Sequence, residues 1–419
     1  MEPFSLDSSL DRYAELIVRV GLNLQPGQRL LLNGRNAALG VSLAAAPLAG
    51  AVARRAYEAQ AQLVDTLWAD ETVSLVRHRH APRDSFEQFA SWRAQALLET
   101  MEGGDASLTV LAEDPFLLRD EDDETVGVER QTMLEQTRPA MNLLRRNVTN
   151  WCVVGAATPG WAARVFPGAA QEEQLTLLWQ ALFQVCRVDV PDPVQAWCTH
   201  IDDLVARSDY LNARRYRRLH FRSEGTDLLL GLPEQHRWAS ARFVSSNDIT
   251  FVANLPTEEV FTLPHRLEAE GHITASRPMN YGGTIIEDMT LRFEEGRVVR
   301  ASAQSGEKTL QQLLDTDEGA RRLGEVALVP HSSPISRMGI LFHNTLVDEN
   351  AASHLALGSA YRFSLEDGPG MTAEALLAAG GNDSLLHADF MIGTADMDVD
   401  GLLGNGDREA IMRRGEWAF

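Results

Sequence analysis

Short apolar runs alternate with longer segments of helical spacing in the first half of the chain. The apolar runs, which predict buried strands, lie at 29–33, 63–67, 107–111 and 151–155. Apolar residues at helical spacing predict helices at 6–20, 44–62, 86–101 and 125–146. Buried strands that alternate with helices are typical of a parallel sheet covered on both faces. The first half is therefore predicted to be an α/β domain built on a parallel sheet.

The pattern changes to alternating apolar and polar residues in the second half. Two such stretches, 284–294 and 297–304, flank a Glu-Gly pair, which predicts a β-hairpin. The segment 189–197 contains two prolines and indicates a connection between domains. We therefore expect an N-terminal α/β domain at 1–195. We expect an α+β domain with a mainly antiparallel sheet at 196–419.

The balance of charge excludes several classes of partner. The chain carries 59 acidic and 38 basic residues, a formal net charge of −21 at pH 7. Nucleic acids and anionic membranes are bound through Lys and Arg, so neither is expected as a partner. The sequence has no apolar stretch long enough to span a membrane, and its N-terminus lacks the pattern of a signal peptide. Three cysteines without Cys-x-x-Cys spacing make a cytoplasmic protein without disulfides the expectation.

Known catalytic motifs are largely missing. The glycine-rich phosphate loops G-x-G-x-x-G and G-x-x-x-x-G-K-[ST] do not follow any predicted strand, which argues against a nucleotide-dependent α/β enzyme. G-x-S-x-G and H-E-x-x-H are also absent. Catalytic residues must therefore be sought elsewhere.

Carboxylates and histidines gather in four short segments of the second half. They are the acidic pair Glu258-Glu259, Glu325, the group Asp348, Glu349, His354 and Tyr361, and the pair His387 and Asp389. Residues i and i+2 of a strand face the same side, so His387 and Asp389 can hold one ion together. Adjacent acids on an extended chain point to opposite sides, so one member of the acidic pair faces a given site. On a helix, Glu349 would lie within a turn or so of His354.

Together these segments indicate a metal site. Histidine and carboxylate ligands without cysteine suit zinc, cobalt, manganese or similar divalent ions. Two histidines and three carboxylates are enough to hold two ions bridged by a carboxylate. Each segment also has a structural alternative: a helix start for 258–259, an ion pair with 321–322 for Glu325, and a core hydrogen bond for His354.

The segment 396–407 is similar to a calcium loop. Its three acids at alternate positions, followed by Gly401, match the pattern D-x-[DN]-x-[DN]-G. However, Asp407 stands where the loop needs a bidentate Glu, and a strand-like stretch precedes the loop instead of a helix. A turn lined by acids is the preferred interpretation. A non-catalytic metal- or calcium-binding protein that uses 396–407 is the alternative function.

Four motifs occur in a fixed order in the second half. They are N-L-P-T-E-E-V-F-T at 254–262, G-E-V-A-L-V at 324–329, F-H-N-T-L-V-D-E-N-A-A-S-H-L-A-L-G-S-A-Y at 342–361 and N-D-S-L-L-H-A-D-F-M-I-G at 382–393. Together they resemble the M29 family of metalloaminopeptidases, the thermophilic aminopeptidase T type. The opening Y-A-E-L-I-V-R-V-G-L-N-L-Q-P-G-Q at 13–28 also resembles that family.

The resemblance implies a homodimer that removes N-terminal amino acids from peptides with a free N-terminus. It implies that the C-terminal domain encloses two divalent ions, with zinc, cobalt, manganese and magnesium as candidates. The motif matches imply metal ligands at Glu259, Glu325, His354, His387 and Asp389. Glu259 is preferred over Glu258, and Tyr361 is implied to be a catalytic residue beside the ions.

A mechanism follows as a hypothesis. Two ions activate a bridging water, which attacks the scissile carbonyl. Glu325 is the candidate bridging carboxylate, and the Tyr361 hydroxyl would stabilise the oxyanion. Glu349 is a candidate proton shuttle, or alternatively a partner that orients His354.

Overall fold

The computed structural model describes residues 5–281 and 284–419, and the chain forms two compact units. Unit 1 comprises Met1–Ile201, Arg242–Pro256 and Leu341–Leu346, and unit 2 comprises Asp202–Ala241, Thr257–Ile340 and Val347–Phe419. A parallel sheet lies in unit 1 and antiparallel sheets lie in unit 2, so the mixed α/β content agrees with the sequence prediction. The division at residue 195 stays a prediction.

A five-stranded parallel sheet forms the centre of unit 1, in the order β11-β6-β5-β1-β3. Its strands are β1 Arg29–Asn33, β3 Leu63–Thr66, β5 Ala106–Leu111, β6 Trp151–Gly155 and β11 Asn254–Leu255. The first four match predicted strands. β11 comes from far along the chain and pairs with β6, which the sequence pattern did not reveal. It follows the short antiparallel pair β9 Arg242–Val244 and β10 Thr250–Val252.

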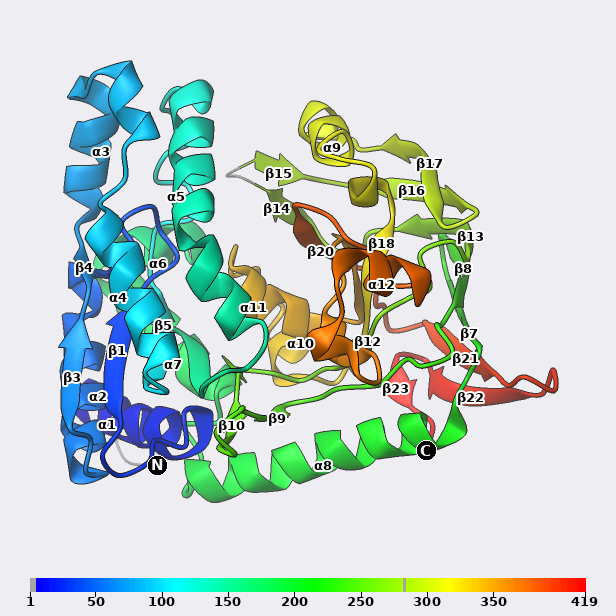
Figure 1. The fold of residues 1–419 in the computed structure, drawn as a ribbon, viewed down its shortest axis with the longest axis horizontal. Helices are drawn as coiled ribbons and strands as arrows, with labels where there is room; N and C mark the ends of the chain where they lie inside the picture. The colour runs from blue at the N-terminus through cyan, green and yellow to red at the C-terminus, as the bar shows by residue number, and fades with distance from the viewer. Residues whose placement is uncertain (1–4, 282–283) are drawn as a thin grey trace. The chain divides into compact units, whose positions relative to one another are not determined.

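Helices flank the parallel sheet (Figure 1). They are α1 Leu6–Leu16, α2 Ala46–Glu58, α3 Glu71–His80, α4 Ser91–Glu102, α5 Asp123–Leu144, α6 Pro159–Val165 and α7 Gln171–Val185. Leu31 of β1 packs with Leu97 of α4 and Ala140 of α5 in one apolar cluster. The Tyr13 hydroxyl of α1 donates a hydrogen bond to the Gly155 carbonyl over 3.2 Å. Within the described residues, no helix is long and apolar enough to cross a membrane.

An eight-stranded antiparallel sheet is the larger sheet of unit 2. Its strands, in spatial order, are β17 Arg297–Ser302, β16 Thr290–Glu294, β13 Ala269–Thr274, β8 Thr226–Gly231, β7 Arg218–Ser223, β21 Asp398–Leu402, β22 Arg408–Arg413 and β23 Glu416–Trp417. In β7, Leu219 and Phe221 are buried, whereas Arg218 and Arg222 are exposed. This alternation puts one face of the sheet on the core and the other in solvent. The predicted hairpin around Glu295-Gly296 is present as β16 and β17.

A second antiparallel sheet in unit 2 has four strands, in the order β12-β18-β19-β20. They are β12 Val260–Thr262, β18 Leu323–Leu328, β19 His354–Gly358 and β20 His387–Met391. The remaining elements named in Figure 1 are β4 Trp68–Ala69, α8 Pro193–Arg214, α9 Glu307–Leu314, α10 Pro334–Met338, α11 Thr345–Asp348, α12 Ala373–Ala378, β14 Met279–Tyr281 and β15 Thr284–Ile286. β18 and β19 are buried along their whole length, so charged residues on them need partners.

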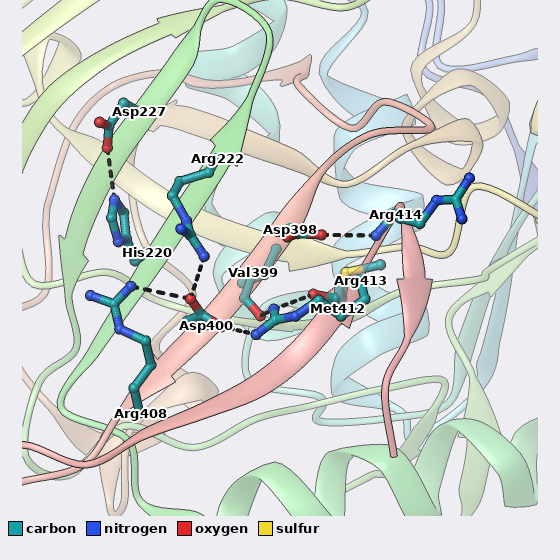
Figure 2. Close-up of polar contacts among 10 residues, drawn as sticks. All are labelled: His220, Arg222, Asp227, Asp398, Val399, Asp400, Arg408, Met412, Arg413 and Arg414. Atoms are coloured by element: carbon teal, nitrogen blue, oxygen red, sulfur yellow. Dashed lines mark hydrogen bonds and ion pairs between the residues drawn. The ribbon is translucent and has the colours of Figure 1, made fainter.

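The acidic segment 396–407 forms part of a β-hairpin, and the calcium-loop interpretation is wrong. Figure 2 shows three arginines that converge on Asp400 of β21, whose side chain is 1% exposed. Asp400 Oδ2 accepts hydrogen bonds from Arg222 over 2.7 Å and from Arg408 over 3.3 Å, and Oδ1 accepts one from Arg413. Because a buried carboxylate costs free energy unless it is paired, these arginines stabilise its charge. Its oxygens therefore bind guanidinium groups rather than calcium.

Candidate active site

The four-stranded sheet presents four of the predicted site residues on one face. Glu325 of β18 pairs with Ala356 of β19, which pairs with Asp389 of β20, so these three residues form one row across the sheet. His354 and His387 lie two residues from Ala356 and Asp389, so both share the face of that row. The small side chain of Ala356 leaves room between the two carboxylates. The i and i+2 placement of His387 and Asp389 agrees with the sequence prediction.

The two adjacent acids before β12, Glu258 and Glu259, lie in different environments. Glu259 lies two residues before Phe261, which pairs with Ala327 of β18, so Glu259 extends the same face of the sheet. The backbone N–H of Glu258 donates a hydrogen bond to Asn350 Oδ1 over 2.6 Å. Both acids are buried, but it is Glu259 that the structure groups with His354 and Glu325.

Within the described residues, two overlapping groups of side chains have the spacing of a metal site. Ligand atoms of Glu259, Glu325 and His354 lie within 4.8 Å of one another, as do those of Glu325, His387 and Asp389. His354 Nε2 lies 3.1 Å from Glu259 Oε2 and 3.8 Å from Glu325 Oε1. His387 Nε2 lies 3.3 Å from Glu325 Oε2 and 3.3 Å from Asp389 Oδ1. Glu325 thus directs one oxygen toward each histidine and belongs to both groups.

Backbone carbonyls orient both imidazole rings. His354 Nδ1 lies 3.1 Å from the Ala352 carbonyl, and His387 Nδ1 lies 2.7 Å from the Ser359 carbonyl. A carbonyl can only accept, so in each ring Nδ1 carries the proton of the hydrogen bond. Nε2 then faces the carboxylates, and loss of its proton would free a lone pair for an ion. This is the usual arrangement of histidine ligands in metalloproteins.

The electrostatics of the cluster fit a bound cation. Burial raises the pKa of Glu259, His354 opposes that rise, and the charges of Glu325 and Asp389 raise the pKa further. Three carboxylates so close together in a buried site repel one another, so nearby positive charge stabilises them. Divalent ions supply that charge, and the oxygen and imidazole donors match zinc, cobalt or manganese.

Tyr361 lies shortly after β19, beside the cluster of candidate metal-ligating side chains. Its ring centroid lies 4.8 Å from that of His387. The positive charge of His387 lowers the pKa of the Tyr361 hydroxyl, but burial and the charges of Glu325, Asp389 and Glu349 outweigh it and raise the pKa to about 12. Tyr361 therefore keeps its proton near neutral pH and can donate a hydrogen bond.

Glu349 lies in a single 3₁₀ turn, Glu349–Ala351, rather than on one helix with His354. The predicted helical link between these two residues is wrong, because His354 is the first residue of β19. Burial raises the pKa of Glu349 well above its usual range, and the charges of Glu259 and Asp389 raise it further. Since His354 Nδ1 bonds to the Ala352 carbonyl, Glu349 is not the partner that orients this ring. Asp348, also singled out in the sequence, lies outside both groups.

Sequence reasoning missed two aromatic residues beside the cluster. Phe363 stacks on Tyr361 with ring centroids 5.2 Å apart, and Phe261 meets Tyr361 edge-on at 6.3 Å. Each lies two residues after a predicted site residue, Phe261 after Glu259 and Phe363 after Tyr361. This two-residue spacing is the sequence feature that could have indicated both aromatic residues.

The acidic pair gives a direct test of ligand assignment. We expect Glu259→Gln to weaken metal binding by at least about tenfold, because one charged ligand becomes a neutral amide. Glu258→Gln, an equal change at the neighbouring buried acid, should leave metal affinity within about twofold. Metal content after dialysis against graded chelator concentrations measures both variants. Loss of metal in Glu258→Gln alone would reverse the assignment.

Comparisons with known proteins identify the family of the chain. The family model for thermophilic metalloprotease M29 matches residues 6–417. The chain is 42% identical to aminopeptidase AmpS of Bacillus subtilis over 99% of this chain and 100% of that protein. It is 43% identical to aminopeptidase T of Thermus thermophilus over 98% of both chains. The solved structure of wild-type AmpT from Thermus thermophilus matches with a TM-score of 0.92 and 42% identity, over 99% of this chain and 100% of that one. The chain therefore belongs to the M29 family of thermophilic metalloproteases.

Proposed function

We propose that this chain is a metalloaminopeptidase that removes N-terminal amino acids from peptides, with two divalent ions at one site. The observation that carries the proposal is the position of Glu325, whose carboxylate belongs to both groups of metal-ligating side chains. The names of the related proteins, aminopeptidase AmpS and aminopeptidase T, support the exopeptidase activity. The proposed metal ligands are Glu259, Glu325, His354, His387 and Asp389.

The proposed ligands divide between two ions. Glu259 and His354 would hold one ion, His387 and Asp389 would hold the other, and Glu325 would contribute to both groups. Zinc, cobalt, manganese and magnesium are the candidate ions. When bound, such ions lower the pKa of a coordinated water and polarise a carbonyl. The protein contributes fixed ligand positions, because backbone carbonyls orient both histidines.

Tyr361 is proposed to donate a hydrogen bond to the oxyanion that develops on the scissile carbonyl. A donor aimed at charge that appears only in the transition state raises kcat, because it does not stabilise the ground state equally. The pKa of about 12 keeps the proton on the phenol at working pH. The ring contact with His387 supports this role, because His387 is one of the proposed ligands.

Glu349 is proposed to carry the proton from the attacking water to the leaving amine. Its raised pKa, caused by burial and by neighbouring carboxylates, suits a group that must accept and then release a proton. The hydrogen bond between His354 and Ala352 supports this role over that of a partner that orients the ring.

The homodimer, the cytoplasmic location and the two-domain division at residue 195 are further parts of the proposal, resting on the family resemblance and the sequence.

Removal of the metal tests the proposed function. We expect a chelator to abolish hydrolysis of aminoacyl p-nitroanilides, and we expect zinc, cobalt, manganese or magnesium to restore it. An acetylated substrate of the same sequence is the control, because an aminopeptidase requires a free α-amino group. Equal hydrolysis of the acetylated substrate would contradict the exopeptidase assignment. Activity that survives complete metal removal would contradict the metal mechanism.

A further inference from the structure

Three neighbouring rings pack against the ring of Tyr361. Phe363 stacks on it with centroids 5.2 Å apart and planes 17° from parallel. His387 approaches it at 4.8 Å with a 52° tilt. Phe261 meets both rings edge-on, at 6.3 Å from Tyr361 and 6.0 Å from Phe363. Offset stacking and edge-to-face contacts are the favourable geometries for aromatic pairs.

The turn that carries Phe363 is itself anchored. Phe363 lies in the 3₁₀ turn Arg362–Ser364, which starts directly after Tyr361. The Ser364 carbonyl accepts a hydrogen bond from the Arg237 backbone N–H over 2.8 Å. The Arg237 carbonyl in turn accepts one from the Thr262 hydroxyl of β12 over 2.9 Å. The position of Phe363 is therefore tied to the strand that also carries Phe261.

We propose that Phe363 is a positioning residue for the peptidase reaction, which holds the Tyr361 phenol in the orientation that stabilises the transition state. This inference rests on the proposed function. The tyrosine side chain rotates about Cα–Cβ and Cβ–Cγ, and rotation about Cα–Cβ would move its hydroxyl oxygen by several ångströms. Packing against Phe363 and His387 restricts that rotation before substrate binds. Preorganised donors are effective because they need no rearrangement during the reaction.

Phe363→Leu tests the proposal, since it keeps an apolar side chain but removes the flat ring. We expect kcat to fall about tenfold, because small misplacements of catalytic groups cost one to two orders of magnitude. KM and metal content should change little, since the ligands are untouched. Phe363→Tyr, which keeps the ring face, should restore kcat to within about twofold of the unchanged protein.

A double-mutant cycle separates positioning from other roles. If Phe363 acts through Tyr361, then Phe363→Leu should have no further effect on kcat once Tyr361 is already phenylalanine. An undiminished tenfold loss in that background would overturn the proposal, as would full activity of Phe363→Leu alone. A fall in kcat that the Tyr variant does not restore would also overturn it. Should the Leu variant fail to fold, Phe363→Met enters the same cycle.

The cycle also distinguishes this proposal from the proposed function. Tyr361→Phe alone reports whether Tyr361 takes part in catalysis, whatever the role of Phe363. If Tyr361→Phe is inactive while Phe363→Leu is fully active, the function stands and the positioning role fails. Phe293→Leu, in the core of the eight-stranded sheet, controls for general loss of aromatic packing in unit 2. It should leave kcat unchanged.

Discussion

Replacing Glu325 with glutamine is expected to release both metal ions and to lower kcat/KM about a thousandfold, on the order of 4 kcal/mol. The reason is that Glu325 belongs to both groups of candidate metal ligands, with one carboxylate oxygen toward each histidine. A neutral amide can offer a single oxygen and no charge, so both proposed ions would lose affinity. Metal analysis after dialysis and steady-state kinetics on an aminoacyl p-nitroanilide measure the two effects.

Glu318→Gln is the matched control for Glu325→Gln. Glu318 is an exposed acid seven positions before Glu325, and its partners are Arg297 and Arg322 rather than histidines. The control should keep both ions and full activity. If Glu325→Gln lost one ion and kept the other at unchanged affinity, a shared carboxylate would no longer describe the site.

Replacing Tyr361 with phenylalanine is expected to lower kcat about a hundredfold while both ions stay bound. Removal of one hydrogen-bond donor to an oxyanion typically costs two to three orders of magnitude in kcat. KM should change little, because the donor acts mainly in the transition state. Phenylalanine keeps the ring that stacks on Phe363, so packing is preserved.

Tyr216→Phe provides the control for loss of a buried tyrosine hydroxyl. Tyr216 is fully buried in unit 2, and its hydroxyl donates a hydrogen bond to Glu409 over 2.8 Å. This change should affect stability but not kcat. Full peptidase activity of Tyr361→Phe with both ions bound would exclude Tyr361 from the chemistry.

Three strands of the parallel sheet, β1, β5 and β6, were predictable because each is a short, mainly apolar run. β1, β5 and β6 have nearly uniform burial, so the sequence shows them directly. β11 was not predictable in this way. It has two residues, and its pairing with β6 joins positions about a hundred residues apart, a contact that no local pattern encodes.

The histidine and carboxylate pair of β20 was predictable for a local reason. His387 and Asp389 are two residues apart on a strand, and that spacing alone puts both side chains on one face. The local sequence pattern predicted the wrong conformation for the segment that links Glu349 and His354. The helical turn at 349–351 ends before His354, and β19 begins at that residue. A tertiary constraint, the pairing of β19 with β18 and β20, decided this conformation.

The sequence by itself determined the chemistry of this protein: which side chains can bind a cation, and the ordered motifs that place the chain in its family. Residue types and short spacings are local properties, so they can be read without a fold. Only the tertiary structure decided that Glu325 faces both histidines, that Glu259 rather than Glu258 lies beside His354, and that Phe363 stacks on Tyr361. These contacts depend on the register between strands and on the turns that follow them, which form when distant segments pack together.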